Sequence, residues 1–213
     1  SSVMMTSYVP MMAAPSFYLG LILFAVGALI AIGCLAASTA VNYLFLYIPT
    51  YAVKSLGLSP TIGFVSTCAS SLILAGMTPL VGHISDQLGR TRLMMVAGLG
   101  LLASFYPCFF VLTTLRSAGA LIAVVIWLAI LKGAYFGALP ALLSELFPTA
   151  TRATGLALSY NLGVSIFGGC GPFIMAWLSG VTGSSLAPSY YLTAVTVLSI
   201  FSILRARSHF NIT

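Results

Sequence analysis

Six apolar runs dominate this chain, each long enough for an α-helix to cross the hydrocarbon core of a membrane, which takes about 20 residues. They occupy residues 19–48, 59–81, 93–115, 119–143, 154–177 and 186–205. Within lipid, only helices and closed barrels satisfy every backbone N–H and C=O group. Runs of this length favour helices over the alternating strands of about ten residues that build barrels. We therefore expect an all-α integral membrane protein with six transmembrane helices.

The segments outside these runs are short. Residues 1–18 form the approach to the bundle, 19–207 the bundle itself and 208–213 a tail. None of the connectors between the runs is long enough for a soluble domain. The first run is overlong, so it must tilt, extend into the interface or break. We expect it to break at Pro49.

Charge is too sparse to cover a water-facing surface. Only 5% of the 213 residues are charged, against about a quarter in soluble domains, which excludes a soluble globule. The formal charge of +6 comes from scattered bases, so nucleic acid is not an expected partner. Four isolated cysteines indicate buried thiols, and neither a metal site nor a cofactor is expected; they are Cys34, Cys68, Cys108 and Cys170.

The distribution of bases predicts the orientation. Six spans place residues 1–18, 82–92, 144–153 and 205–213 on one side of the membrane. Five arginines lie on that side, whereas Lys54 and Arg116 lie on the other. Short cytoplasmic loops carry an excess of Lys and Arg, so we expect both ends of this segment to lie in the cytoplasm. We expect the protein itself to reside in the cell (inner) membrane.

Lys132 is the one base deep within a span. A charge at a helix centre costs about 2.5–3.5 kcal/mol on insertion scales, so such a residue usually faces a cavity or a partner. Tyr135 is three residues further along, on the same face, and Gly133 with Gly137 forms a GxxxG pair that permits close helix packing. An ammonium that binds an anionic substrate is one interpretation. A structural lysine that snorkels or bonds a carbonyl is the other.

Two further spans carry polar groups at membrane depth. Asn42, Tyr43 and Tyr47 lie near the end of the first span, either as substrate ligands or as part of an interfacial tyrosine belt. Asn161 and Ser165 share one face of the fifth span. A glycine-rich run follows them and predicts either a binding-site helix break or a simple packing kink; it contains Gly168, Gly169, Gly171 and Pro172.

Both acids of the chain, Asp86 and Glu145, occur in compact turns at the expected cytoplasmic rim. Such turns pack helices tightly and suggest a gate latch rather than catalysis. The residues of the expected latch are Gly82, Asp86, Gly89, Arg90, Arg92, Glu145 and Arg152.

These turns carry a resemblance to a known family. The pattern Gly82-x-x-x-Asp86-x-x-Gly89-Arg90-x-Arg92 resembles the cytoplasmic loop motif of the major facilitator superfamily. Together with the stretch from Glu145 to Asn161 and the sequence Tyr47-Ile-Pro-Thr-Tyr51, it looks like the metabolite:proton symporter family within that superfamily. The match runs from about residue 40 to 180.

The resemblance implies the C-terminal six-helix half of a twelve-helix carrier, built from two inverted three-helix repeats. Its partners would be a missing N-terminal six-helix half, a small organic substrate, a proton and the lipid bilayer. Such a carrier would work by alternating access. The candidate substrate-binding residues are Lys132, Tyr135, Asn42, Tyr43, Tyr47, Asn161 and Ser165.

A lysine suits citrate or another di- or tricarboxylate better than a zwitterion, so proton-coupled symport of an organic anion is the favoured function. Carriage of a proline- or betaine-type zwitterion and a half-size homodimeric carrier or channel are the alternatives. An enzyme is not expected, since intramembrane enzymes place paired acids, Ser–His pairs or metal ligands at membrane depth. Here both acids and both histidines lie at the edges.

Overall fold

The computed structural model describes residues 15–210, with the side chains of all but residues 15–17, 86, 209 and 210. Helices joined by short turns make up this part of the chain, which contains no strand. Residues 1–14 of the expected approach and 211–213 of the expected tail lie outside the described residues. The same holds for the side chain of Asp86, so its expected role in the latch stays a prediction.

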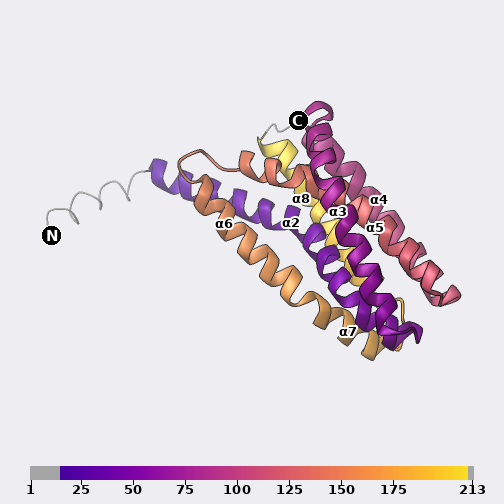
Figure 1. Ribbon diagram of the computed structural model, residues 1–213. Helices are drawn as coiled ribbons and strands as arrows, with labels where there is room; N and C mark the ends of the chain where they lie inside the picture. Colours follow the sequence, from indigo (N-terminus) through magenta and orange to yellow (C-terminus); the bar gives the residue numbers. More distant parts are fainter. Residues whose placement is uncertain (1–14, 211–213) are drawn as a thin grey trace, which may run out of the picture.

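Within residues 15–210, six helical units are long and apolar enough to cross a membrane. Five are continuous: α2 (Pro15–Leu56), α3 (Pro60–Leu88), α4 (Arg90–Leu115), α5 (Ala118–Glu145) and α8 (Ala187–Phe210) (Figure 1). The remaining unit comprises α6 (Arg152–Gly163), the π-helix η1 (Val164–Gly169) and α7 (Gly171–Thr182). The prediction of an all-α protein with six transmembrane helices is therefore confirmed.

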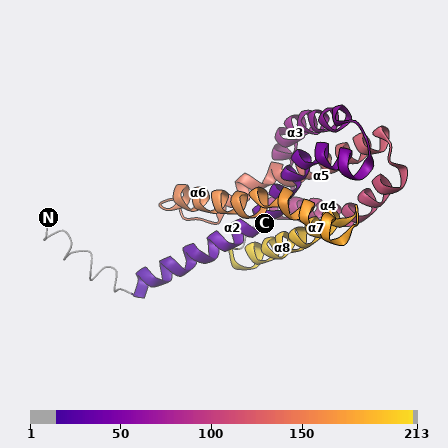
Figure 2. The same cartoon turned by 90° about the horizontal axis from the view of Figure 1, so that it is seen from below.

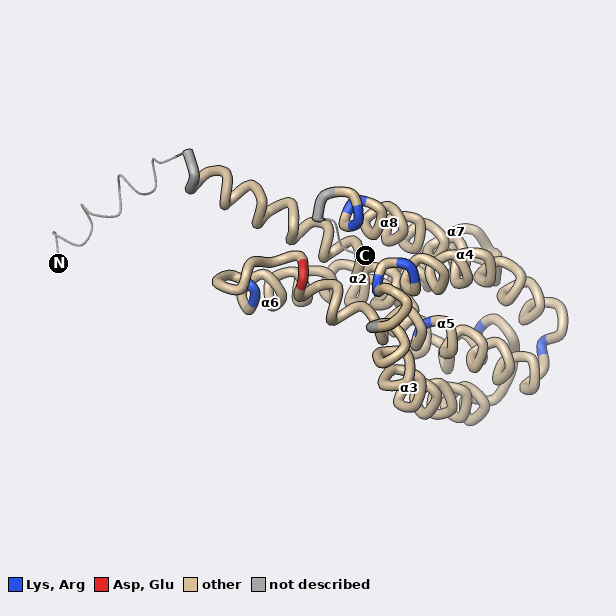
Figure 3. Tube along the Cα trace, turned by 90° about the horizontal axis from the view of Figure 1, so that it is seen from above, with Lys and Arg blue, Asp and Glu red and all other residues tan. Residues whose placement is uncertain are grey.

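Helices α2 and α5 contribute most to the interior of the bundle. Helix α2 contacts every other helical element, and α5 packs mainly against α3 and α4. Seen from below, the beginning of α2 projects away from α3, α4, α5 and α8, whereas its end lies next to α3 (Figure 2). Large side chains such as Tyr135 of α5 and Phe105 of α4 are completely buried between them. Charged positions lie mostly near helix ends (Figure 3).

The GxxxG pair of α5 permits the close packing that the sequence predicts. A Cβ added at Gly133 would lie 2.8 Å from Cβ of Met77, and one added at Gly137 would lie 2.9 Å from Cβ of Val81. Both separations are shorter than van der Waals contact between carbon atoms. Glycine is thus needed at both positions for α5 to approach α3 this closely.

The expected break at Pro49 is wrong, because α2 continues through Pro49 to Leu56. Proline has no N–H, so the carbonyl of Phe45 loses its usual helical donor. The hydroxyl of Thr67 on α3 donates to that carbonyl oxygen, at 3.0 Å, and shares its proton with the carbonyl of Gly63 in its own helix, at 3.1 Å. Within a membrane, such a replacement partner is one of the ways in which a helix tolerates proline. The prediction failed because this partner belongs to another helix.

The expected connector 82–92 is also shorter than predicted. Helix α3 extends to Leu88 and α4 begins at Arg90, which leaves Gly89 as the single residue between them. Gly89 has φ of +90°, a conformation that residues with a Cβ rarely adopt. One glycine therefore reverses the chain where a longer loop was expected.

The fifth span changes helix type near its middle. It is α-helical to Gly163, π-helical from Val164 to Gly169, and α-helical again from Gly171, with Pro172 in the first turn of α7. A π-helix adds a residue to the turn and often marks a functional site. The glycine-rich run thus coincides with the interruption of this span.

Candidate functional site

A pocket of about 290 Å³ lies between α2, α5 and the fifth span. Its floor and walls combine one charged, several polar and several aromatic side chains. The lining residues are Leu35, Ser38, Thr39, Asn42, Tyr43, Lys132, Phe136, Tyr160 and Val164. Of the seven candidate substrate-binding residues, it brings together Lys132, Asn42 and Tyr43.

Lys132 is the charged group of the pocket. The residue is only 5% exposed, and its Nζ donates a hydrogen bond of 2.6 Å to Oδ1 of Asn42. Nζ also lies 5.9 Å from the ring centre of Phe45 and 5.6 Å from that of Phe136, within the range of cation–π attraction. Among the described residues, no ion pair involves Lys132. The ammonium thus has neutral partners, and its charge stays available to an anion.

The sequence places Tyr135 on the face of Lys132, but the structure puts it in the core. Its side chain is fully buried, and its hydroxyl donates a hydrogen bond of 2.7 Å to the carbonyl of Cys34 on α2. Tyr135 is not among the residues that line the pocket. It joins α5 to α2 directly behind the site.

Tyr47 also lies away from the pocket. It is buried near the far end of α2, with its ring 6.3 Å from that of Tyr51. The hydroxyl of Tyr51 in turn donates a hydrogen bond of 2.8 Å to the carbonyl of Ser185 in the turn before α8. These tyrosines pack the end of the bundle and do not contact the Lys132 pocket.

Asn161 and Ser165 are exposed and do not line the Lys132 pocket. The side-chain amide of Asn161 donates to the carbonyl of Ala157 in its own helix, at 2.7 Å. Asn161 instead lines a neighbouring, mainly apolar pocket of about 340 Å³ between α5 and α6. That pocket shares Leu35, Phe136 and Tyr160 with the Lys132 pocket. The two hollows are therefore contiguous along the same helix faces.

Sequence reasoning missed six lining residues, although helical spacing contains a signal for them. On α2, each pocket residue has another pocket residue three or four positions away, so they share a face with Asn42. Phe136 follows Lys132 by four residues, and Val164 follows Tyr160 by four. Extending the faces of Asn42 and Lys132 in steps of three and four would have found most of the lining. The missed residues are Leu35, Ser38, Thr39, Phe136, Tyr160 and Val164.

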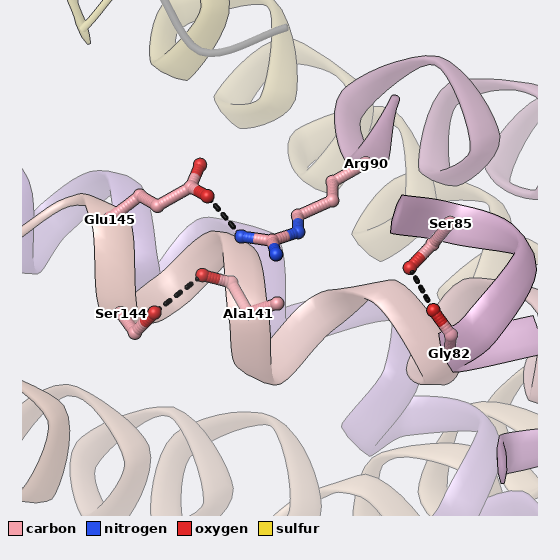
Figure 4. Close-up of polar contacts among 6 residues, drawn as sticks. All are labelled: Gly82, Ser85, Arg90, Ala141, Ser144 and Glu145. Atoms are coloured by element: carbon pink, nitrogen blue, oxygen red, sulfur yellow. Dashed lines mark hydrogen bonds and ion pairs between the residues drawn. The ribbon is translucent and has the colours of Figure 1, made fainter. Parts of the chain in front are cut away.

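At the end of the bundle where α4 begins, several of the residues predicted to form a latch lie close together (Figure 4). Arg90, the first residue of α4, pairs with Glu145, the last residue of α5. Next to them, the hydroxyl of Ser85 donates a hydrogen bond of 2.7 Å to the carbonyl of Gly82. Arg90, Glu145, Gly89 and Arg92 border a hollow of about 380 Å³.

Arg152 belongs to the same end of the bundle but makes a different contact. Its Nε donates to the carbonyl of Phe147, at 3.5 Å, across the turn that joins α5 to α6. Arg152 does not border the hollow beside Arg90. Its contact braces the turn and does not extend the Arg90–Glu145 pair.

The sequence profile of a large carrier family, the Major Facilitator Superfamily, matches residues 30–211. The chain belongs to the Major Facilitator Superfamily. Two curated relatives are similar to it. An ectoine/proline transporter of Corynebacterium glutamicum is 31% identical over 177 residues, which cover 83% of this chain and 35% of the relative. A citrate-proton symporter of Klebsiella pneumoniae is 29% identical over 165 residues, which cover 78% of this chain and 37% of the relative.

This Major Facilitator Superfamily chain is a multi-pass membrane protein and spans a little over a third of the length of these relatives. The names of the relatives include both an organic anion and zwitterions, so likeness alone does not select a substrate. The pocket adds chemistry to the family assignment. An ammonium held by a neutral amide between aromatic rings can bind a carboxylate without first breaking an ion pair.

Proposed function

We propose that this chain is the C-terminal six-helix half of a secondary active transporter that carries a small organic anion together with a proton. A di- or tricarboxylate such as citrate is the favoured substrate. The citrate-proton symporter among the relatives supports this proposal. In such a carrier, two six-helix halves would expose a central site alternately to the two sides of the membrane.

The observation that carries this proposal is the position of Lys132. A buried ammonium is costly, and burial without an acid is costlier still. Here Nζ bonds only the neutral oxygen of Asn42 among the polar contacts described, and it lines a pocket. A substrate carboxylate would supply the missing negative charge, which explains why a lysine is tolerated at this depth.

The Arg90–Glu145 pair supports a role for that end of the bundle in gating. It joins the beginning of α4 to the end of α5, and α5 carries Lys132. A contact that forms in one state and opens in another would couple this rim to the pocket. With the arginine-rich loops placed inside the cell, this rim would face the cytoplasm, with the protein in the inner membrane.

Proton coupling would need a titratable group that reaches the transport pathway. The two acids of this chain are Asp86 and Glu145, and Glu145 is engaged with Arg90 at the end of the bundle. We therefore assign the coupling acid to a part of the carrier outside these 213 residues. The 213-residue chain alone should not accumulate citrate in proteoliposomes under a pH gradient.

The direct test is citrate uptake by the carrier expressed from its complete coding sequence. Lys132→Ala should abolish uptake with expression unchanged, because it removes the charge that binds the carboxylate. Lys54→Ala, which removes an exposed lysine at the end of α2, should leave uptake unchanged. Unchanged citrate uptake in Lys132→Ala would reject the assignment.

A zwitterionic substrate is the second candidate, and a specific feature of the pocket favours it. Tyr43, Phe136 and Tyr160 line the same hollow as Lys132. Aromatic faces bind cationic nitrogen, so they could hold the positive end of a proline- or betaine-type molecule while Lys132 holds its carboxylate. Uptake of labelled proline that excess citrate does not inhibit would select this candidate over the first.

A further inference from the structure

Gly168 lies directly behind two residues that line the pocket. A Cβ added at Gly168 would lie 2.3 Å from Cε2 of Tyr43 and 2.9 Å from Cγ2 of Thr39. Tyr43 and Thr39 are both pocket residues on α2. The backbone of η1 therefore touches the wall of the pocket from behind, where no side chain larger than hydrogen fits.

The neighbouring glycine faces a different environment. A Cβ added at Gly169 would meet no atom within 4 Å, and Gly169 is exposed. Both glycines belong to the same π-helical turn. Both positions are glycine, but only Gly168 faces Tyr43. The backbone geometry of the π-helix therefore decides which of the two contacts the ring.

A hydroxyl from α8 holds that register. Tyr191 donates a hydrogen bond of 2.8 Å to the carbonyl of Phe167, the residue before Gly168. The wider π turn alters the regular backbone pairing of the helix, and in a membrane the affected carbonyls need other donors. Tyr191 supplies one of them. Its ring also lies against Gly171, since a Cβ there would be 3.5 Å from the tyrosine oxygen.

We propose that Gly168, set in place by the hydrogen bond from Tyr191, determines the width of the Lys132 pocket through Tyr43 and Thr39, and thereby the size of the substrate that the carrier accepts. This inference rests on the proposed function, because it assigns the Lys132 pocket to the substrate. Gly168 and Tyr191 act through the wall of the pocket and are positioning residues.

The physical basis is the lack of free space behind the wall. A methyl group at position 168 would overlap the ring of Tyr43, so the ring must move away from η1. Interiors are close-packed, and a displaced ring takes volume from the nearest hollow. For Tyr43 that hollow is the pocket of about 290 Å³. A narrower pocket would exclude large carboxylates before small ones.

The first experiment compares the uptake of citrate and of the smaller malonate by the carrier expressed from its complete coding sequence. Gly168→Ala should raise the KM for citrate relative to malonate by about ten-fold, the discrimination that one added carbon makes in a tight pocket. Gly169→Ala is the matched control and should leave the ratio unchanged. Equal KM ratios in the two variants would overturn the proposal.

This comparison separates the two proposals. If the parent carrier takes up neither carboxylate, the proposed function is wrong. If the parent takes up citrate and both glycine variants behave alike, the proposed function stands and the role of Gly168 is wrong. A merely structural role for Gly168 would lower expression and uptake of both substrates together, which also contradicts the inference.

The second experiment needs no transport. Ser38→Cys, with Cys68, Cys108 and Cys170 replaced by serine, puts a thiol on the pocket wall. This thiol is reacted with aminoethyl methanethiosulfonate and with the bulkier trimethylammonioethyl methanethiosulfonate. The ratio of the two reaction rates reports the width of the pocket. Gly168→Ala should slow the bulkier reagent about ten-fold more than Gly169→Ala does. Equal rates in the two glycine variants, or an unreactive parent thiol, would overturn the inference.

The hydrogen bond to Phe167 has its own paired test. Tyr191→Phe removes the hydroxyl and should raise the citrate-to-malonate KM ratio in the same direction as Gly168→Ala, by a smaller factor. Tyr190→Phe alters an exposed neighbour and should not change the ratio. If Tyr191→Phe matches Tyr190→Phe, the assignment of Tyr191 as the group that holds Gly168 in place is wrong.

Discussion

At the scale of single residues, two polar side chains of α5 find their hydrogen-bond partners on α2. Lys132 of α5 bonds Asn42 of α2, and Tyr135 of α5 bonds the carbonyl of Cys34 of α2. Each contact satisfies a group that would cost several kcal/mol if left bare in hydrocarbon. These bonds also fix α5 against α2 at the pocket.

Thr67 gives a prediction at this scale. Thr67→Val keeps the shape of the side chain but removes the hydroxyl that satisfies the Phe45 carbonyl opposite Pro49. An unsatisfied buried acceptor costs about 1–3 kcal/mol, so the free energy of unfolding in detergent should fall by that amount. Reversible denaturation in mixed micelles measures it.

The control for Thr67 is a hydroxyl on the same helix that bonds only within it. Ser71 is exposed, and its hydroxyl donates to the carbonyl of Thr67. Ser71→Ala should change the free energy of unfolding by less than about 0.5 kcal/mol. If both variants lose the same amount, the Thr67 hydroxyl does not compensate for Pro49.

The sequence could identify Lys132 and Asn42, because a charge and an amide stand out inside apolar runs. It could not place Tyr135 or Tyr47, because whether a residue faces a pocket or a neighbouring helix depends on where the other helices lie. Tyr160 and Phe136 could not be assigned to the site for a related reason: aromatic residues are common in lipid-facing positions, and only the packing shows that these two line a hollow.

At the scale of helices, glycines decide how closely two elements approach. Gly133 and Gly137 of α5 lie against Met77 and Val81 of α3, so neither has room for a side chain. Elsewhere on α3, Gly76 faces open space, with nothing within 4 Å of an added Cβ. Glycine thus permits close packing at Gly133 and Gly137, whereas Gly76 makes no such contact.

This contrast predicts opposite effects of alanine. Gly137→Ala should destabilise the protein by about 1–3 kcal/mol, because it overfills the contact with α3. Gly76→Ala should be neutral or stabilise by up to about 1 kcal/mol, since alanine favours helix and meets no obstacle. Thermal unfolding of the purified variants in detergent measures both. A destabilised Gly76→Ala or an unaffected Gly137→Ala would contradict the packing of α3 on α5.

Breaks within helices were the part of the fold that sequence predicted least well. Proline at 49 and the glycine-rich run near 168 both predict interruption, yet of the two only the glycine-rich run, in the fifth span, departs from α-helix. The outcome depends on partners: the Thr67 hydroxyl supports a continuous α2, whereas Tyr191 supports the π turn. Such partners are distant in sequence and cannot be read from local composition.

At the scale of the whole molecule, the six-span architecture followed from run length alone, because the membrane sets how long an apolar helix must be. The Lys132 pocket did not follow from it. Three spans line the pocket, and the length of an apolar run does not determine which face each helix turns toward the others. The sequence predicts the two rim motifs separately. The structure shows that Arg90 of one motif and Glu145 of the other form an ion pair.

The rim pair predicts a shift in the balance between states of the carrier. Arg90 and Glu145 are partly exposed, and such pairs contribute about 0.2–1 kcal/mol. Glu145→Gln should therefore shift the equilibrium toward the state open at this rim by no more than about five-fold. The labelling rate of Asn161→Cys, a position exposed on α6, from each side of the membrane measures this shift.

Charge exchange controls for other effects of the substitution. Arg90→Glu combined with Glu145→Arg should restore much of the parent labelling ratio, because the pair is re-formed in reverse. High salt should reduce the difference between parent and Glu145→Gln, since exposed charges are screened. If Glu145→Gln leaves the labelling ratio of Asn161→Cys unchanged at low salt, the Arg90–Glu145 pair is not part of a gate.

The central claim is that the Lys132 ammonium faces the pocket and binds the carboxylate of the substrate. The most direct measurement is chemical rescue in the carrier expressed from its complete coding sequence. Lys132→Cys should not take up citrate until an aminoethyl methanethiosulfonate restores a positive charge, and citrate should slow that modification. A thiol that does not react, or equal recovery with an uncharged methyl reagent, would contradict the claim.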